Sequence, residues 1–489
     1  MGVPSRGAHR LHPGGDRRGA RPGRQPDRAR AVRGVHGRRL RDRDARPHRL
    51  HPTGRLRHHD LDRGPGPHQH RRHRRNPADQ GHHPPVRVLR RVVAADVAGR
   101  GRDPAVGRPG GLTVSAAPPT WAIVAGGGTA GHVLPGLAVA RELVDRGHRP
   151  ETLHFVGAER GIESRLVPEA GFTITLLPGR GLQRRLTLQN VAAAFGLAVA
   201  LARAIVLVRR RRPAVVLALG GFASAACALA AVLWRVPLVL ADQNARAGAS
   251  NRLVARFARA AAVPFEETDL PGAVVTGNPV RGEILAVAAD PDPAAARRTL
   301  GLPDGRTVVV VFAGSLGSRR INEAVYGALS AWTGRSDLAV HHVVGSRDWD
   351  DRPDAARREP SWGGPDGLWY RAVRYEDRMD LVLAAADLAV CRAGGTTVAE
   401  LAVLGVPAVL VPLPIATRDH QSANAGPLVR AGAAVLVPDA ELDAARLVAE
   451  VDGLLAGDLA ARSDAARSLG RPDAAAAVAD LVETHARPR

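Results

Sequence analysis

The 489-residue sequence contains no lysine, so arginine supplies all 69 of its basic side chains. Cysteine is nearly absent: Cys227 and Cys391 are the only two, and neither belongs to a CxxC pair. Two such cysteines are too few for a disulfide framework and favour a reducing cytosol as the compartment. Aromatic residues make up only 3%. Arginine in place of lysine, beside abundant alanine and valine, is typical of a GC-rich genome, so these scarcities say little about chemistry.

The positive charge is unevenly distributed along the chain. Residues 1–110 hold 28 Arg, 9 Asp, no Glu and 12 of the 19 His, a formal excess of +19 out of the total of +22. The remaining 379 residues are close to neutral. A nucleic-acid-binding domain carries its excess positive charge on its own folded surface. The charge pattern therefore weighs against nucleic acid as a partner of the main part of the chain.

Residues 1–118 show no apolar period of 2 or 3.6 and are rich in Arg, His, Pro and Gly. A segment of this composition cannot bury enough apolar surface to offset the entropy of ordering it, so we expect disorder. It lacks the apolar h-region of a signal peptide. Three interpretations stay open: a basic arm for nucleic acid or anionic lipid, an extension without function, or upstream DNA translated from a mis-set start codon.

From Trp121 onward, short apolar strands alternate with helices. Strands are predicted at 121–128, 153–157, 214–221, 237–244, 307–315, 338–345, 387–395 and 407–413. Helices are predicted at 135–146, with Pro135 in the first turn and Gly147 at the end, between 221 and 237, and at 396–405. Continuous apolar strands between helices indicate parallel sheets covered on both faces. The sequence therefore predicts an α/β protein with two Rossmann-like domains, 119–278 and 279–470, facing a cleft, and a C-terminal helix or tail at 471–489.

One apolar segment, residues 191–208, is long enough to require comparison with a membrane span. Arg203 interrupts it and the run Arg209–Arg212 ends it. Because a span needs about 20 predominantly apolar residues, a buried or surface-lying amphipathic helix is favoured. Its arginine end could rest on anionic lipid headgroups.

The first glycine loop, Gly126–Gly131, follows the first strand and precedes a helix. Such a loop lets an anion approach the backbone N–H groups of a helix N-terminus, although a tight strand–helix turn needs the same glycines. The spacing Gly126-x-Gly128-x-x-Gly131 also fits a dinucleotide fingerprint. That fingerprint requires an acidic residue at the end of the second strand, where the nearest one is Glu159. The dehydrogenase interpretation is therefore weak.

Further polar motifs fall where strands end, which is where open parallel sheets bind ligands. They are Gly220–Ser224, Asp242-Gln243-Asn244, Gly314–Gly317 and Arg392–Thr397. Glu400 follows the last motif, and we expect its carboxylate on the first helical turn facing the cleft, suited to ribose hydroxyls. The alternative for Glu400 is compensation of the helix dipole by an acid near the N-terminus.

Taken together, the motifs resemble those of one family. The segments GGGTAGHVLPGLAVARELVDRGH, GGF, DQN, GNPVR, CRAGGTTVAE and DHQSANA occur in the order and spacing of the MurG enzymes, the UDP-GlcNAc:lipid I transferases of bacterial peptidoglycan synthesis. The resemblance covers about residues 120–485. It implies a GT-B fold, no metal and no other cofactor, and a peripheral location on the cytoplasmic face of the plasma membrane.

The resemblance also implies the reaction and its partners. The muramyl 4-hydroxyl of undecaprenyl-pyrophosphoryl-MurNAc-pentapeptide (lipid I) would attack the anomeric carbon of UDP-GlcNAc with inversion, giving lipid II. The N-terminal domain would receive the acceptor and the C-terminal domain the donor. Other implied partners are anionic inner-membrane lipids and proteins of cell-wall synthesis and division. The alternatives are another GT-B glycosyltransferase or a UDP-GlcNAc 2-epimerase-like enzyme, which would use a soluble acceptor or none.

The family motifs map onto specific positions of this chain. Those implied for UDP-GlcNAc binding are Thr129, Ala130, Gly131, Asn244, Arg281, Ser315, Glu376, Gly395, Thr396, Thr397, Val398, Ala399, Glu400 and Gln421. Arg281 and Ser315 would contact the nucleotide and diphosphate, Asn244 the donor sugar and Gln421 the GlcNAc hydroxyls. Glu376 falls where a backbone group meets the uracil.

Two residues are candidates for the base that an inverting transfer requires. His132 lies at the mouth of the first glycine loop and titrates near neutrality, and Asp242 is the second candidate. The chain departs from the family in places: Ala241-Asp242 replaces His-Glu, Phe222 a common Tyr, Leu316 a Gln, and Ser318 an Ala. These changes indicate a divergent branch, because Asn244, Arg281, Ser315, Glu400 and Gln421 are retained.

Overall fold

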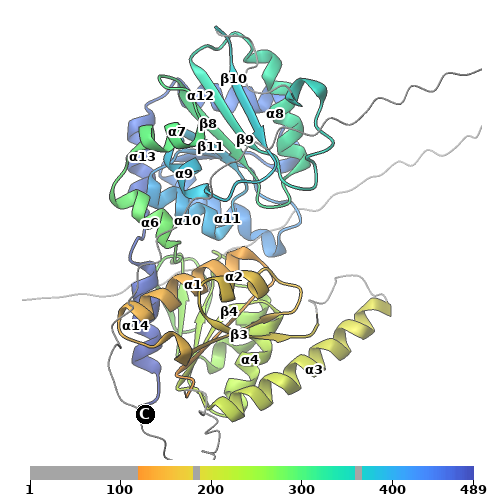
Figure 1. Ribbon diagram of the computed structural model, residues 1–489, viewed down its shortest axis with the longest axis vertical. Coiled ribbons are helices and arrows are strands. Elements are labelled where there is room, and N and C mark those ends of the chain that lie inside the picture. The colour runs from red at the N-terminus through yellow and green to blue at the C-terminus, as the bar shows by residue number, and fades with distance from the viewer. Residues whose placement is uncertain (1–118, 180–187, 358–365, 489) are drawn as a thin grey trace, which may run out of the picture. The chain divides into compact units, whose positions relative to one another are not determined.

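The computed structural model describes residues 119–179, 188–357 and 366–488, of which 188–195 and 355 are described by backbone alone. The predictions for residues 1–118 lie outside the described residues. Two parallel β-sheets form the framework, each flanked by helices (Figure 1). This arrangement confirms the predicted α/β class with two Rossmann-like halves.

The first sheet has seven strands in the order β3-β2-β1-β4-β5-β6-β7. They are β1 Ala122–Gly126, β2 Leu153–Ala158, β3 Thr173–Leu177, β4 Val215–Gly220, β5 Leu238–Ala241, β6 Ala260–Val263 and β7 Ala273–Val275. Its helices are α1 Ala130–Asp145, α2 Glu163–Glu169, α3 Leu188–Arg211, α4 Phe222–Leu233 and α5 Ala249–Val254, with short 3-10 turns at Pro150–Thr152 and Ala255–Phe257. The central strands β1, β2, β4, β5 and β6 are fully buried, as expected from sequences that are apolar throughout except for His154 in β2, which bonds to Thr173 and Thr175.

The second sheet has six strands in the order β10-β9-β8-β11-β12-β13. They are β8 Thr307–Phe312, β9 Leu338–Val343, β10 Trp369–Val373, β11 Leu388–Cys391, β12 Ala408–Leu410 and β13 Ala434–Leu436. The helices are α6 Gly282–Ala289, α7 Pro293–Leu300, α8 Arg319–Ala331, α9 Met379–Ala384, α10 Gly395–Leu404, α11 His420–Arg430, α12 Ala444–Leu455 and α13 Leu459–Ser468, with 3-10 turns at Asp354–Arg357, Thr417–Asp419 and Asp439–Glu441. Apolar cores fill both faces of this sheet.

Helix α1 begins earlier than the sequence predicts. It starts at Ala130, directly after the glycine loop, so Pro135 lies inside the helix and not in its first turn. The free N–H groups at the start of the helix therefore lie within the glycine loop. The predicted end is confirmed: Gly147 adopts φ +101°, and the amides of Gly147 and His148 bond back to Val144 and Leu143.

The last helix, α14 (Ala474–His485), packs against the first sheet although it follows the second in sequence. Val478, Ala479 and Val482 are fully buried in the core beside β1, β4 and α1. Figure 1 shows this blue helix alongside the orange α1. The domain boundaries that the sequence suggests stay a prediction.

Helix α3 is the apolar segment that required comparison with a membrane span. It runs from Leu188 to Arg211, so Arg209–Arg211 lie in its last turn and Arg212 follows the helix. Across the described parts of the chain, no helix combines the length and the apolar character that crossing a bilayer needs.

Candidate active site

A cleft of about 1390 Å³ is lined by the loops at the carboxyl ends of both sheets. From the first half it receives the glycine loop, the turn after β4 and the segment after β5. From the second half it receives the loop after β8, the start of α10 and residues before and within α11. Its position agrees with the rule that open parallel sheets bind ligands beyond their strand ends.

The cleft brings together most of the residues that the sequence predicts. Those in its lining are Thr129, Ala130, Gly131, His132, Asp242, Asn244, Ser315, Gly395, Thr396, Thr397 and Gln421. Among the described candidates, five lie outside the lining: Arg281, Glu376, Val398, Ala399 and Glu400. Val398 is 2% exposed and its side chain belongs to the core, with Ala399 packed beside it.

His132 lies in the first turn of α1 and is half-buried. Its Nδ1 is 3.2 Å from the hydroxyl of Thr129, and its Nε2 packs over Gly220, whose lack of a side chain leaves the ring room. A base acting through Nε2 requires the ring proton on Nδ1, where the Thr129 hydroxyl is in place to accept it. Burial lowers the pKa of His132, and the nearby carboxylate of Asp242 partly offsets this. The imidazole is therefore neutral at neutral pH, as a base requires.

The Asp242 carboxylate is already engaged in hydrogen bonds. It accepts from the amide N–H of Asn244 at 3.1 Å, from that of Gly248 at 2.9 Å, and from the side chain of Asn251 at 2.9 Å. Asp242 is only 5% exposed. These contacts fold the segment after β5 into its turn and engage both oxygens of the carboxylate.

Asn424, which belongs to the DHQSANA motif but was not among the predicted site residues, links the two halves of the chain beside the cleft. It is fully buried in α11, and its Oδ1 accepts from the amide of Ala245 at 2.8 Å. Its Nδ2 donates to Oδ1 of Asn244 and to the carbonyl of Ala393, both at 3.1 Å. Asn424 thus fixes the side chain of Asn244 and ties the first half of the chain to the second across the cleft.

The N-terminus of α10 supplies free N–H groups from the second half of the chain. Helix α10 begins at Gly395 with Gly394 as its N-cap, and Val398 is the first residue whose amide bonds back into the helix, to Gly394. The amides of Gly395, Thr396 and Thr397 at the cleft surface suit a phosphate. The carbonyl of Gln243 packs so closely on Gly395 that a side chain there would overlap it.

Arg392, at the end of β11, joins three of the loops that line the cleft. Its guanidinium pairs with Asp439 at 2.6 Å, donates to the hydroxyl of Ser318 at 2.6 Å, and donates to the carbonyls of Val411 and Pro412. Ser318, which departs from the family's usual alanine, also caps α8. The other departure in this loop, Leu316, is 61% exposed in the cleft.

Glu400 and Arg281 form an ion pair beside the cleft. The Nε–H of Arg281, the N-cap of α6, donates to Oε1 of Glu400 at 2.9 Å, and Glu400 is 8% exposed. Glu400 lies in the second turn of α10, so the expectation of a first-turn carboxylate is wrong. Burial raises the pKa of Glu400, while Arg281 opposes that rise. Glu376 lies after β10, with its carboxylate 4.0 Å from His341.

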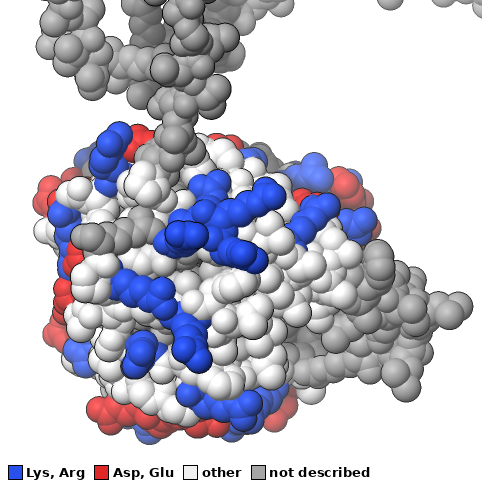
Figure 2. All heavy atoms as spheres, turned by 90° about the horizontal axis from the view of Figure 1, so that it is seen from below, with Lys and Arg blue, Asp and Glu red and all other residues white. Residues whose placement is uncertain are grey.

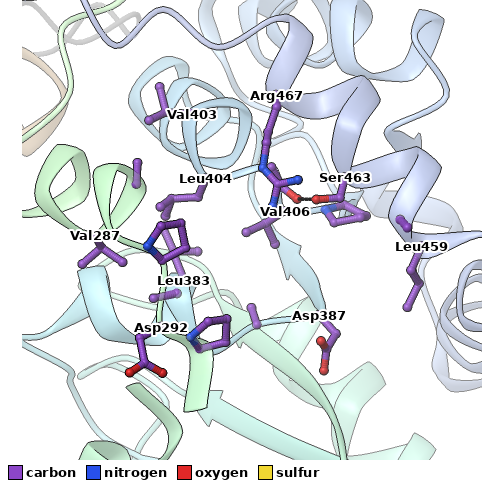
Figure 3. A pocket seen from close by; sticks show the side chains of 18 residues that line it. Val287, Asp292, Leu383, Asp387, Val403, Leu404, Val406, Leu459, Ser463 and Arg467 are labelled. Atoms are coloured by element: carbon purple, nitrogen blue, oxygen red, sulfur yellow. Dashed lines mark hydrogen bonds between the residues drawn. The ribbon is translucent and has the colours of Figure 1, made fainter. Parts of the chain in front are cut away.

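A second cavity, of about 340 Å³, lies at the opposite ends of the second sheet, before β11 and β12 (Figure 3). Apolar side chains such as Val287, Leu383 and Val406 dominate its lining. Its polar groups have partners within the chain: Ser463 donates to the carbonyl of Gly405, and Asp387 accepts from Arg297. The cavity holds none of the predicted residues, so the cleft is the better candidate for the active site.

The described residues include no group of three carboxylate, imidazole or thiol side chains placed to hold a metal ion. A metal-free reaction stays a prediction of the family resemblance.

Two domain matches and several relatives place the chain in a family. Residues 122–263 match the glycosyltransferase family 28 N-terminal domain and residues 308–483 its C-terminal domain. The UDP-N-acetylglucosamine--N-acetylmuramyl-(pentapeptide) pyrophosphoryl-undecaprenol N-acetylglucosamine transferase of Desulforudis audaxviator is 37% identical over 368 residues, covering 74% of this chain and 97% of that protein. The enzyme of the same name from Mycobacterium avium is 40% identical over 417 residues, covering 81% and 98%.

Similarity to solved structures agrees with these domain matches and relatives. The MurG structure from Acinetobacter baumannii has a TM-score of 0.57 and 27% identity, covering 75% of this chain and all of that one. A UDP-GlcNAc 2-epimerase from Neisseria meningitidis has a TM-score of 0.53 at 13% identity, which shows the fold alone. Two Rossmann-like domains that share one cleft define the GT-B fold, and the two domain matches make the chain a glycosyltransferase of that fold. The chain belongs to glycosyltransferase family 28 and, within it, to the MurG family.

Proposed function

We propose that this chain transfers GlcNAc from UDP-GlcNAc to the 4-hydroxyl of the MurNAc sugar in undecaprenyl-pyrophosphoryl-MurNAc-pentapeptide, giving lipid II. The observation that carries the proposal is the single cleft whose lining includes both the glycine-loop residues Thr129–His132 of the first half and the residues Ser315, Gly395–Thr397 and Gln421 of the second half. The extensive identity to transferases of this activity over nearly their whole length supports it.

The transfer proceeds as one inverting displacement. The MurNAc 4-oxygen forms a bond to the anomeric carbon of GlcNAc while the bond from that carbon to the UDP oxygen breaks. His132 takes the proton of the attacking hydroxyl on Nε2, because its lowered pKa keeps the ring neutral. The amides at the start of α10 stabilise the negative charge that develops on the departing diphosphate. Asn244, held by Asn424, orients the sugar.

The donor-side roles divide between the cleft and the neighbouring ion pair. Gln421 accepts from the amide of Leu413 with its Oε1, which leaves its NH₂ group to donate to GlcNAc hydroxyls. Glu400 takes the ribose hydroxyls, with Arg281 holding its carboxylate, and the backbone at Glu376 takes the uracil. Arg281 therefore contributes chiefly through Glu400 and only secondarily to the nucleotide.

The test is a transfer assay with the full chain, labelled UDP-GlcNAc and a lipid I analogue. The expected product carries one labelled GlcNAc in a β-1,4 link. Transfer to a soluble aglycone, or 2-epimerisation of UDP-GlcNAc without any acceptor, would support the alternative enzymes instead. No structural observation favours these alternatives, because the likeness to the epimerase shows only the shared fold.

The acceptor is a membrane lipid, so we also propose a membrane-facing surface on the first domain. Exposed arginines gather where α3 and α4 end and after α5: Arg209, Arg210, Arg212, Arg235, Arg256 and Arg259. Exposed apolar side chains lie among them in sequence, with Leu233 at 58%, Trp234 at 36% and Phe257 at 45% exposure. Figure 2 shows arginines gathered among uncharged side chains on this end of the domain.

The contacts suit an interfacial surface. The guanidinium of Arg209 lies 5.1 Å from the Trp234 ring, and that of Arg256 lies 4.6 Å from Phe257. Arginine heads beside aromatic rings bind anionic headgroups while the rings enter the interface. We propose that this surface places the chain peripherally on the cytoplasmic face of the plasma membrane. Binding to cell-wall synthesis and division proteins stays a prediction from the resemblance.

Vesicle co-sedimentation tests the surface. The full chain should bind vesicles with anionic lipid more tightly than vesicles of phosphatidylcholine alone, and each arginine near the surface contributes about 1 kcal/mol. The pair Arg209→Ser and Arg210→Ser should therefore weaken binding about tenfold or more. The matched control is Arg160→Ser with Arg298→Ser, two exposed arginines elsewhere. Equal binding by both double variants would contradict the assignment.

A further inference from the structure

Glu163 is a buried carboxylate that the mechanism above does not use. It begins α2 and is 1% exposed. Its oxygens accept from the amide of Gly128 at 3.0 and 3.1 Å, and one of them accepts from the amide of Ala158 at 2.6 Å. Within the described part of the chain, no arginine forms an ion pair with it. Backbone N–H groups alone therefore compensate for its charge, and such bonds are strong because the acceptor is ionised.

Three glycines form the chamber around this side chain. A Cβ atom added to Gly127, Gly157 or Gly161 would overlap the Glu163 side chain. These glycines come from the glycine loop after β1 and from the turn after β2. The carboxylate thus joins the two loops. Glycine at these three positions leaves the space that the Glu163 side chain occupies.

The same side chain explains an unresolved feature of the sequence. The dinucleotide fingerprint requires an acid near the end of the second strand to hold a ribose. Glu163 follows that strand, but its carboxylate turns into the glycine loop and binds the amide of Gly128. The amide of Gly128 is therefore not available to a ligand. The amides of His132 and Val133 donate to the carbonyl of Thr129, which leaves the amides of Ala130 and Gly131 as donors at the start of α1.

We propose that Glu163 is a positioning residue of the transfer reaction: by fixing the turn Gly126–Gly128 it sets the places of Thr129 and His132 on the acceptor side of the cleft. The inference rests on the proposed function. Glu163 acts through the loop and does not touch the substrates. Its loss therefore impairs acceptor use more than donor use, because Ser315, Gly395–Thr397 and Gln421 of the second half keep their places.

The charge of Glu163 also acts on His132. The ionisable groups that face His132 are Asp242, Glu163 and His420, on three different elements. Burial lowers the pKa of His132; Asp242 and Glu163 raise it, and His420 lowers it further. Removing the Glu163 charge thus lowers this pKa. Because a base works in its neutral form, the acid limb of the pH profile moves to lower pH.

Two substitutions separate the charge from the reach of the side chain. Glu163→Gln keeps the length but removes the charge and presents an NH₂ group to backbone donors. Glu163→Asp keeps the charge but is one methylene shorter and cannot span both amides. The matched control is Glu169→Gln, at the exposed end of the same helix α2. All variants are made in the full chain and assayed with a lipid I analogue and UDP-GlcNAc.

Glu163→Gln should raise the KM for the lipid I analogue about ten- to hundredfold, the equivalent of one hydrogen bond to a charged group. Its KM for UDP-GlcNAc should rise by less than the acceptor KM, because most of the proposed donor contacts lie in the second half, and the acid limb should move to lower pH. Glu163→Asp should raise the acceptor KM without moving the acid limb, and Glu169→Gln should change neither. Equal rises in the two KM values, or a wild-type acceptor KM in Glu163→Gln, would overturn the proposal.

Amide hydrogen exchange tests the loop independently of catalysis. The amides of Gly128 and Ala158 should be protected in the wild type and in Glu169→Gln, and exchange much faster in Glu163→Ala. Unchanged protection in Glu163→Ala would overturn the positioning role. If the wild type transfers no sugar yet shows this exchange pattern, the proposed function fails while the role of Glu163 in the loop stands.

Discussion

Arg281 donates its Nε–H to Oε1 of Glu400 over 2.9 Å, joining the start of α6 to the second turn of α10. Glu400 is nearly buried, and burial disfavours its charged form while Arg281 favours it. Arg281 thus opposes the effect of burial and favours the ionised form of the Glu400 carboxylate, to which we assign the ribose hydroxyls.

Removing either partner of this pair should weaken donor binding. Arg281→Ala leaves Glu400 buried without its cation, which costs about 3 kcal/mol or more of folding stability and lets the carboxyl protonate more easily. Its Kd for UDP-GlcNAc should rise most at low pH. Titration calorimetry over a range of pH measures this. Glu400→Ala should weaken donor binding at every pH, and an unchanged donor Kd in Glu400→Ala would remove Glu400 from the ribose role.

His132→Ala should lower kcat about 10²- to 10⁴-fold, the usual contribution of a general base. Donor Kd should stay unchanged, because the ring is on the acceptor side. In the wild type, the acid limb of kcat/KM should lie below pH 6.5, the ordinary pKa of histidine, since burial lowers the value. Steady-state kinetics across pH 4 to 9 measure both effects. A wild-type rate for His132→Ala would exclude this base.

Asn424→Ala should damage both folding and transfer. The substitution leaves the amide of Ala245 and the carbonyl of Ala393 without their partner, at about 1–3 kcal/mol for each buried group, and frees the side chain of Asn244. Asn424→Asp keeps the acceptor for Ala245 but loses both donated bonds. In Asn424→Asp a buried carboxylate oxygen also faces the carbonyl of Ala393 and Oδ1 of Asn244, so we expect both variants to unfold at a lower free energy than the wild type. A wild-type unfolding free energy for Asn424→Ala would contradict the role of this contact.

The attachment of α14 should depend on pH through Glu483. Burial raises its pKa, but hydrogen bonds from Arg146 and His148 outweigh burial and hold the pKa below the ordinary 4.5. The stabilisation is thus present above pH 4.5 and is lost as pH falls through the lowered value. Because the group is part-exposed, the effect should be below about 1 kcal/mol. Denaturant unfolding at pH 3 to 7 should show Glu483→Gln less stable than the wild type at pH 6 and equal to it at the acid end.

The sequence predicted the strands well because they are continuous apolar runs that end in glycine or polar motifs, as in Ala122–Gly126 and Leu388–Cys391. Short or less apolar strands, such as β7 and β13, had no comparable pattern. The start of α1 was misplaced because Pro135 resembles a first-turn proline. The helix instead begins at the glycine loop, whose Thr129 is still extended.

Site residues that directly follow a strand could be predicted from the sequence. Contacts between residues far apart in the sequence could not. Thr129, Asn244 and Ser315 follow strands, so the parallel topology alone places them at the cleft. Asn424 reaches Asn244 across 180 residues, and Glu163 reaches Gly128 across 35. No local pattern encodes such pairings, because they depend on how the two sheets and their loops pack.

The most direct test of the central claim is sugar transfer by the purified full chain. Incubated with radiolabelled UDP-GlcNAc and a lipid I analogue, the wild type should convert the analogue to a product carrying one labelled GlcNAc, and His132→Ala should fail to do so while still binding UDP-GlcNAc. A folded wild-type chain that binds UDP-GlcNAc but never labels the lipid I analogue would contradict the account.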